Sequence, residues 1–197
     1  MSIQMSENCD FGVLECQPPF SKDEEYQIAI FEQSSGEKEL FFSIGRPLNA
    51  NVPLLKFICP SKLIGDYVYN NKDWPIASSR LAKLIQLLEK DVELYPAVIL
   101  DQDTGKIHTD FWVMNFTQCL DCIDREKSEV MIHPLYPNLI SSINKLVLNQ
   151  EEIGNTKIFR VGEKPSLLVA HKSVKENIDS LGVNDINWIP IQNYRRA

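Results

Sequence analysis

Two cysteines with the spacing of a metal or redox site are the first residues of this sequence that could do chemistry. Cys119 and Cys122 form its single Cys-x-x-Cys motif, and such a pair can hold a zinc ion or exchange a disulfide. A zinc site needs two further ligands, but the three histidines are isolated and no second motif is present. A redox pair needs a low thiol pKa, which Asp121 and Asp124 would oppose. We therefore expect buried, chemically inert thiols, with no metal and no cofactor.

The polar residues beside these cysteines are better suited to holding a turn than to catalysis. Asp121, Asp124 and Ser128 can hydrogen-bond neighbouring backbone N–H groups and so fix a connection between a strand and a helix. The predicted structural motif comprises Cys119, Asp121, Cys122, Asp124 and Ser128. The alternative is a small enzyme with a pocket near Asp121, Asp124 and His133. Because Walker, G-x-S-x-G, H-E-x-x-H and glycine-rich dinucleotide motifs are absent from the sequence, we expect no enzymatic activity.

Negative charge is concentrated in the first quarter of the chain. Residues 1–50 contain nine acids and three bases, a net charge of −6, against −7 for all 197 residues. This charge argues against nucleic acid as a direct ligand, because phosphate binding needs a basic surface, and it suits a basic protein partner. The alternative is a solvated surface that only aids solubility. The candidate partner-binding residues are Asp23, Glu24, Glu25, Glu32, Glu37 and Glu39.

Hydrophobic patterning predicts an N-terminal hairpin and a first helix. Residues 26–31 and 39–44 are β-prone runs separated by a Ser-Ser-Gly turn signal, which indicates a β-hairpin. Further on, four aliphatic residues recur at helical spacing; they are Leu81, Leu84, Ile85 and Leu88. Ser78 or Ser79 can cap the first turn of this helix.

A second helix follows the pattern of the first. A capping box begins at Ser173, and Gly182 can end the helix. Residues 74–99 and 167–192 both read as strand, helix, strand, which we interpret as a weak internal repeat. The matched residues are Ala77 with Ala170, Ile85 with Ile178, Leu88 with Leu181, and Pro96 with Pro190. Coincidence is the alternative, since any two such units share a binary pattern.

These elements together predict an α/β (α+β) protein with mixed, largely antiparallel sheets and a repeated strand-helix-strand unit. A short helix is also expected at residues 137–145. The 197 residues should form one globular chain, with an acidic β-hairpin lobe at 1–59 and a larger domain at 60–197. The first residues lack a basic region followed by an apolar one, and the apolar runs are too short for a membrane span. We therefore expect a cytoplasmic protein without membrane contact.

The order of motifs in the second half resembles a known family. The most specific pieces are Asp121-Cys122-Ile123-Asp124 with Lys127-Ser128, the triplet Ile158-Phe159-Arg160, and the two units ending at Pro96 and Pro190. Over roughly residues 60–191, this pattern is similar to the eleventh class of bacterial immunity proteins, which are encoded beside polymorphic or secreted toxins. The resemblance implies a protein that binds and neutralises a cognate toxin, and the expected cytoplasmic location adds that this secreted or contact-delivered toxin acts in the cytosol. An adaptor protein with no such toxin is the alternative.

Overall fold

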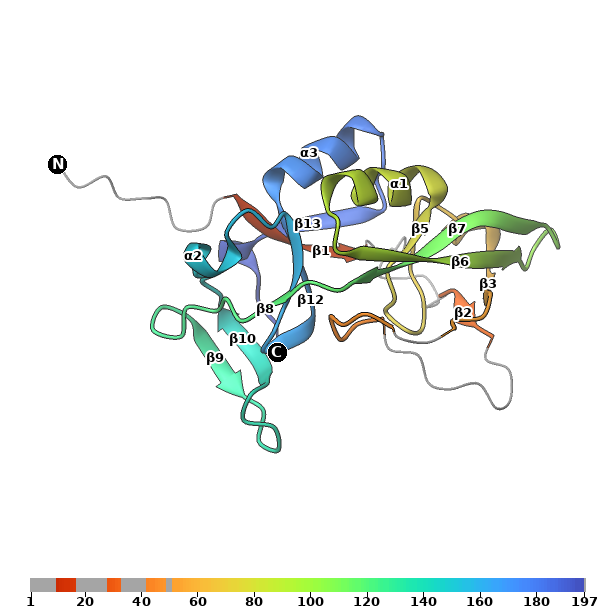
Figure 1. Cartoon of the computed structure of the whole chain (residues 1–197). Helices are drawn as coiled ribbons and strands as arrows, with labels where there is room; N and C mark the ends of the chain where they lie inside the picture. The colour runs from red at the N-terminus through yellow and green to blue at the C-terminus, as the bar shows by residue number, and fades with distance from the viewer. Residues whose placement is uncertain (1–9, 17–27, 33–41, 49–50, 197) are drawn as a thin grey trace.

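The computed structural model describes residues 10–16, 28–32, 42–48 and 51–196, and its strands in those ranges form three sheets (Figure 1). The six-stranded sheet contains, in spatial order, β2 (Ile30–Phe31), β3 (Leu55–Cys59), β6 (Val92–Asp101), β7 (Ile107–Phe116), β5 (Ile76–Ser78) and β4 (Tyr67–Val68). The five-stranded sheet contains β13 (Ile186–Pro190), β1 (Phe11–Cys16), β12 (Lys164–His171), β11 (Ile158–Val161) and β8 (Cys119–Leu120). The third sheet pairs β9 (Glu129–Ile132) with β10 (Ile140–Lys145).

Most neighbouring strands in these sheets are antiparallel. The parallel pairs are β3 with β6 and β11 with β8, while the hairpins and the central strands of both larger sheets pair in antiparallel fashion. The predicted α+β fold with mixed, largely antiparallel sheets is therefore confirmed.

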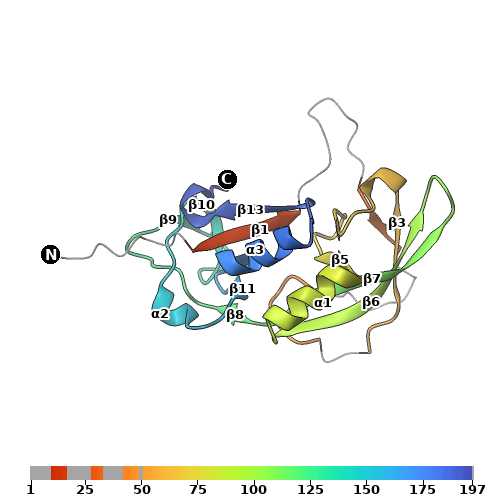
Figure 2. The same cartoon turned by 90° about the horizontal axis from the view of Figure 1, so that it is seen from above.

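The two longer helices lie together against the larger sheets. The helices are α1 (Ser79–Leu88), α2 (Gln150–Ile153) and α3 (Lys172–Ser180), with 3₁₀ turns at Ser61–Leu63 and Ile191–Asn193. Figures 1 and 2 show α1 and α3 side by side on one face of the molecule. Their apolar stripes form a core with both larger sheets. Each helix contributes a pair of buried aliphatic residues at i and i+4, and α1 adds Ala82; the pairs are Leu81 with Ile85 and Val174 with Ile178. In the described part of the chain, no helix is both long and apolar enough to cross a membrane.

The two longer helices start directly after a strand, but their capping residues differ. As the sequence predicts, Ser78 caps α1, and its Oγ accepts the Leu81 N–H at 3.5 Å. The cap of α3 is His171, whose Nδ1 accepts the Ser173 N–H at 3.1 Å. The predicted capping box at Ser173 is therefore wrong, because the chain turns helical as soon as β12 ends. Gly182 follows α3 with φ +71° and marks its end.

The two predicted strand-helix-strand units have the same pairing around a central strand. In the first unit β5 and β6 flank β7, and in the second β12 and β13 flank β1, each central strand being antiparallel to both neighbours. The matched alanine and proline of the first unit both lie opposite Trp112, and those of the second both lie opposite Gly12. The correspondence therefore extends to the central strands, where Phe11-Gly-Val-Leu aligns with Phe111-Trp-Val-Met.

A tryptophan ring lies near the start of the helix in both units, but it comes from different strands. Trp112 belongs to the central strand β7 and donates its Nε1–H to the Ser79 Oγ at 2.9 Å. In the second unit the central strand carries Gly12, and Trp188 of the neighbouring β13 packs over it; a Cβ at residue 12 would clash with the indole. The Trp188 Nε1–H donates to the Ala170 carbonyl at 3.2 Å. Glycine is thus required at residue 12 for space.

The helix predicted at residues 137–145 is wrong, because β10 occupies most of this segment. Ile140 and Ile143 are both buried and lie three residues apart, which is a helical spacing. The pairing of β10 with β9 shifts register between Ile140 and Ser142 and again between Ile143 and Lys145. A β-bulge adds one residue to a strand and reverses the alternation of its faces. Two isoleucines three residues apart can therefore both face the core from a strand.

The first 59 residues contribute strands to both larger sheets. β1 pairs with β12 and β13, and β3 pairs with β6. Most of the predicted hairpin of residues 26–31 and 39–44 lies outside the described residues. Of the part that is described, β2 pairs with β3, and residues 42–44 form a turn and bend.

Candidate functional site

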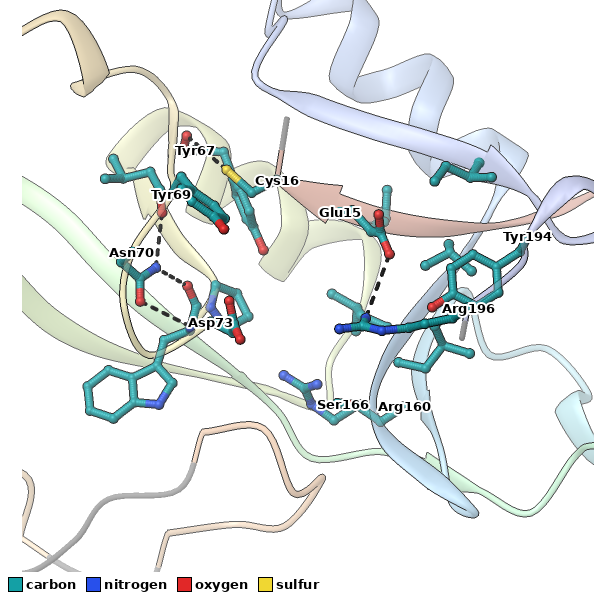
Figure 3. Close-up of a pocket in the computed structure, with 18 of the residues that line it drawn as sticks. Glu15, Cys16, Tyr67, Tyr69, Asn70, Asp73, Arg160, Ser166, Tyr194 and Arg196 are labelled. Atoms are coloured by element: carbon teal, nitrogen blue, oxygen red, sulfur yellow. Dashed lines mark hydrogen bonds and ion pairs between the residues drawn. The ribbon is translucent and has the colours of Figure 1, made fainter. Parts of the chain in front are cut away.

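The structure contains a cavity of about 540 Å³ between the two larger sheets (Figure 3). Its walls come from the end of β1, from the segment around β4, from β12, and from the residues that follow β13. Figure 3 shows Tyr67, Tyr69, Asn70 and Asp73 on one side, facing Arg160 and Arg196 on the other. Ligand sites of small molecules usually have volumes of about 300–1,000 Å³, so this cavity has the size of a binding site.

A single buried amide shapes one wall of this cavity. Asn70 is 3% exposed, and its Nδ2 donates to the carbonyls of Val68 at 3.0 Å and Trp74 at 2.7 Å. Its Oδ1 accepts the N–H groups of Lys72 at 3.1 Å and Trp74 at 3.2 Å. With all its hydrogen bonds made, Asn70 holds the turn in which Asp73 has a φ of +52°. The turn places the Asp73 carboxylate at the cavity, while the Trp74 indole packs against Phe31, Phe42 and Phe57 in the core.

Arg160 of β11 is the most buried charged group at the cavity, with 2% exposure. Its Nη1 donates to the Pro165 carbonyl at 2.8 Å and its Nη2 to the Phe42 carbonyl at 2.9 Å. Its Nε has no hydrogen-bond acceptor among the described residues. Burial lowers the pKa of the guanidinium to about 10, so Arg160 remains a cation at neutral pH. Carbonyl dipoles solvate it, but in the described ranges no carboxylate lies within ion-pair distance of it.

The thiol that lines the cavity is not reactive. Cys16 ends β1, and its Sγ lies 3.8 Å from the Tyr67 carbonyl oxygen. Burial raises the pKa of this thiol to about 12, with a further contribution from the charges of Asp185 and Asp73. Because the thiolate is the nucleophile, Cys16 is an inert wall residue at neutral pH.

The Cys-x-x-Cys motif lies outside the cavity, in and after the edge strand β8. Cys122 is buried, and burial followed by the charge of Glu163 raises the pKa of its thiol to about 12. Cys119 is exposed, so the expectation of burial is wrong for it; β8 is a two-residue edge strand that turns this side chain outward. Burial of the thiol and then the charge of Asp121 still raise the pKa of Cys119. No cluster of potential metal ligands occurs among the described residues.

The polar residues around this motif hold the loop between β8 and β9. This loop connects two strands, whereas the sequence analysis expected a connection between a strand and a helix. The Asp124 Oδ1 accepts the N–H groups of Glu126 at 3.1 Å and Lys127 at 3.2 Å. The Ser128 Oγ accepts the Val147 N–H at 2.9 Å and donates to its carbonyl at 3.0 Å. Each of these side chains thus bonds to nearby backbone groups.

The alternative enzyme site at Asp121, Asp124 and His133 has no counterpart at the cavity, since none of the three lines it. The His133 Nδ1 accepts the Leu135 N–H at 3.2 Å and so closes a turn at the far end of β9. Asp121 packs against Gly162, where its carboxylate occupies the space that a Cβ would need. The structure therefore gives the three residues separate local roles.

Of the six candidate partner-binding acids, one lies in the described part of the chain. Glu32 follows β2 and is exposed. The other five, Asp23, Glu24, Glu25, Glu37 and Glu39, lie outside the described residues.

Sequence reasoning missed a protruding hairpin with an apolar tip. β9 and β10 project from the body of the protein (Figure 1). Four large hydrophobic side chains within six residues are exposed there, with exposed fractions of 62% for Met131, 41% for Ile132, 77% for Leu135 and 59% for Tyr136. The signal in the sequence is the segment MIHPLYP, in which two apolar pairs are separated by His133-Pro134 and followed by Pro137. Prolines at such positions favour a turn.

Comparison with known proteins agrees with the motif pattern. A model of the immunity protein family Imm11 matches residues 50–193. A search of curated proteins gives no match for the chain. The matched range includes β3 to β13, the cavity residue Arg160 and the whole β9–β10 hairpin.

Proposed function

The chain belongs to the Imm11 family of immunity proteins, and from this premise we propose that it binds and neutralises one cognate bacterial toxin that acts in the cytosol. The proposal is one of binding. The four thiols that the structure describes all have raised pKa values, so none of them is activated as a nucleophile. Cys16, Cys59, Cys119 and Cys122 are all free thiols. Free thiols are usual for proteins in reducing compartments, which supports a cytosolic site of action.

The exposed apolar tip of the β9–β10 hairpin is the observation that carries the proposal. Among the described residues, nine large hydrophobic side chains are exposed, and four of them lie within the six residues 131–136, at the end of β9 and in the turn after it. Scattered exposed apolar residues are normal, whereas a contiguous group marks an interaction site. Methionine and tyrosine are enriched at protein interfaces, and tyrosine is a frequent hot spot. The hairpin therefore fits as the anchor that enters a hydrophobic groove of the toxin.

The acidic residues have a different role in this proposal. The net charge of −7 attracts a basic toxin over a distance, and such charges mainly raise the association rate. Asp23, Glu24, Glu25, Glu32, Glu37 and Glu39 are proposed to supply this steering. Apolar contact at the hairpin would then set the lifetime of the complex, because most differences in affinity arise in the dissociation rate.

The test replaces the apolar tip by small polar residues. A variant with Met131→Ser, Leu135→Ser and Tyr136→Ser should keep its fold, since all three side chains are exposed. Hot-spot truncations cost about 2 kcal/mol or more each and are not additive, so the dissociation constant for the toxin should rise by roughly 100-fold or more. The measurements are affinity by calorimetry and survival of cells that produce both proteins.

Leu87→Ser is the matched control, because Leu87 is 85% exposed on α1, away from the hairpin. This control should bind and protect as the wild type does. Unchanged affinity of the triple variant would move the interface away from the hairpin. Failure of the wild type to bind or neutralise its toxin would refute the proposed function itself.

A further inference from the structure

The cavity between the two larger sheets carries an unbalanced positive charge. Its lining contains the cations Arg160, Arg195 and Arg196 and the anions Glu15 and Asp73. Arg196 pairs with Glu15, with 4.0 Å between its Nη1 and the Oε1. Arg195 donates to two backbone carbonyls at the rim. The charge of Asp73 also acts on Arg196, so the lining keeps one excess positive charge, and Arg160 is its buried cation without an ion-pair partner among the described residues.

Arg160 is a buried charge that lacks a counter-charge and one hydrogen-bond acceptor among the described residues. Removal of a guanidinium from water is costly unless a counter-charge and hydrogen bonds replace the solvent. Two carbonyls accept hydrogen bonds from Arg160, but its Nε–H has no acceptor, and the described residues supply no carboxylate partner. A planar guanidinium binds a carboxylate through two parallel N–H···O bonds. A carboxylate bound in the cavity would supply the missing counter-charge. The Nε itself is enclosed by protein atoms, so its N–H reports on the guanidinium without contacting the ligand.

Tyrosine side chains line the cavity on both sides. Figure 3 shows Tyr67 and Tyr69 on one side and Tyr194 on the other, beside Arg196. Aromatic rings bind flat apolar groups through large contact areas. A cavity of about 540 Å³ is too large for a lone carboxylate, so these walls leave room for an apolar body attached to it.

We propose that this cavity binds a small organic carboxylate, with the carboxylate against Arg160 and the apolar part of the ligand between the aromatic walls. This ligand site goes beyond toxin binding and does not depend on it. The cavity is formed by residues far apart in the chain, from β1, β4, β11, β12 and the C-terminal segment. Its occupation therefore links both larger sheets.

The test follows the Arg160 Nε–H directly in the wild-type protein. Formate, benzoate and 3-phenylpropionate are titrated into ¹⁵N-labelled protein, and arginine Nε–H signals are recorded by NMR, with Arg160 assigned through Arg160→Lys. Formate reports the anion site alone, and the two aromatic acids add the apolar body. Saturable movement of the Arg160 signal is expected, together with a rise in melting temperature. Benzamide, the neutral counterpart of benzoate, should bind about tenfold more weakly or worse, because hydrogen bonds to charged groups are worth roughly 1.5–3 kcal/mol.

Arg46→Lys is the matched control, since Arg46 is exposed and does not line the cavity. Arg160→Lys should weaken benzoate binding about tenfold or more, and Arg46→Lys should leave it unchanged. The proposal is overturned if none of the three acids moves the Arg160 signal saturably, or if benzamide binds as tightly as benzoate. Because the site is proposed to be independent of toxin binding, the protein should bind benzoate and the toxin at the same time. Displacement of benzoate by the toxin would overturn the assignment to a free small-molecule carboxylate.

Discussion

The contact between Gly12 and Trp188 predicts a strong energetic coupling between two neighbouring strands. In Gly12→Ala the new methyl group would overlap the Trp188 indole, and overpacking of this kind typically costs about 1–3 kcal/mol. The indole cannot move freely, because its Nε1–H is bonded to the Ala170 carbonyl at 3.2 Å. Trp188→Ala should cost about 2–3 kcal/mol, below the range for a fully buried tryptophan, since Trp188 is only partly buried.

In the double variant the methyl group enters the space that the indole has left. Gly12→Ala should then cost almost nothing, so the two changes should show a coupling of about 1–3 kcal/mol in the double-mutant cycle. The assay is urea unfolding of the four proteins, with midpoint and slope both recorded. The cycle of Gly12→Ala with Trp112→Ala, whose residues lie in different sheets, is the control and should be additive. Additive costs for Gly12 and Trp188 would show that the indole does not limit the space at residue 12.

Three further outcomes follow from the structure. Changing Cys119 and Cys122 to alanine should lower stability by about 1–4 kcal/mol through lost packing at the buried thiol, and elemental analysis of the wild type should find no stoichiometric zinc. Asp101 accepts hydrogen bonds from Ser61 Oγ and nearby backbone N–H groups, which lower its pKa to about 2. The ordinary pKa of an aspartate is about 3.9, so the stabilisation from Asp101 is present above that pH and is lost as the pH falls toward 2. In Asp101→Asn the free energy of unfolding should depend less on pH in this window. An unchanged pH dependence would contradict the assignment. Reversal of Glu24 and Glu25 to lysine should slow association with the toxin at low salt and much less at high salt; equal rates at both salts would exclude steering by this segment.

The periodic elements of this fold could be predicted because their signals are local. The helical spacing of Leu81, Ile85 and Leu88 and the cap at Ser78 are properties of eleven consecutive residues, and α1 begins and ends where they indicate. The error at residues 137–145 has the opposite cause. Its isoleucines have helical spacing, and the bulges that make this spacing compatible with a strand arise only from pairing with β9.

The cavity could not be predicted, because its walls meet only in the folded protein. Arg160 reads in the sequence as one residue of a β-prone triplet, and nothing local distinguishes a buried arginine from one on the exposed face of a strand. The motif at Cys119 and Asp124 was visible for its spacing, yet it forms a loop that the cavity does not include. The roles of the acidic residues and the expected lobe at 1–59 stay predictions.

The position of β1 sets a minimum time before this protein can complete its fold. Phe11 pairs with His171, and Gly12 pairs with both Ala170 and Pro190, so β1 must wait for partner strands that are synthesised well over a hundred residues later. At about 5–20 residues per second, the interval between the two is roughly 10–30 s. The β5-α1-β6-β7 unit, by contrast, is contiguous and can fold during synthesis. Under the proposed function, a cell would depend during this interval on molecules that are already folded.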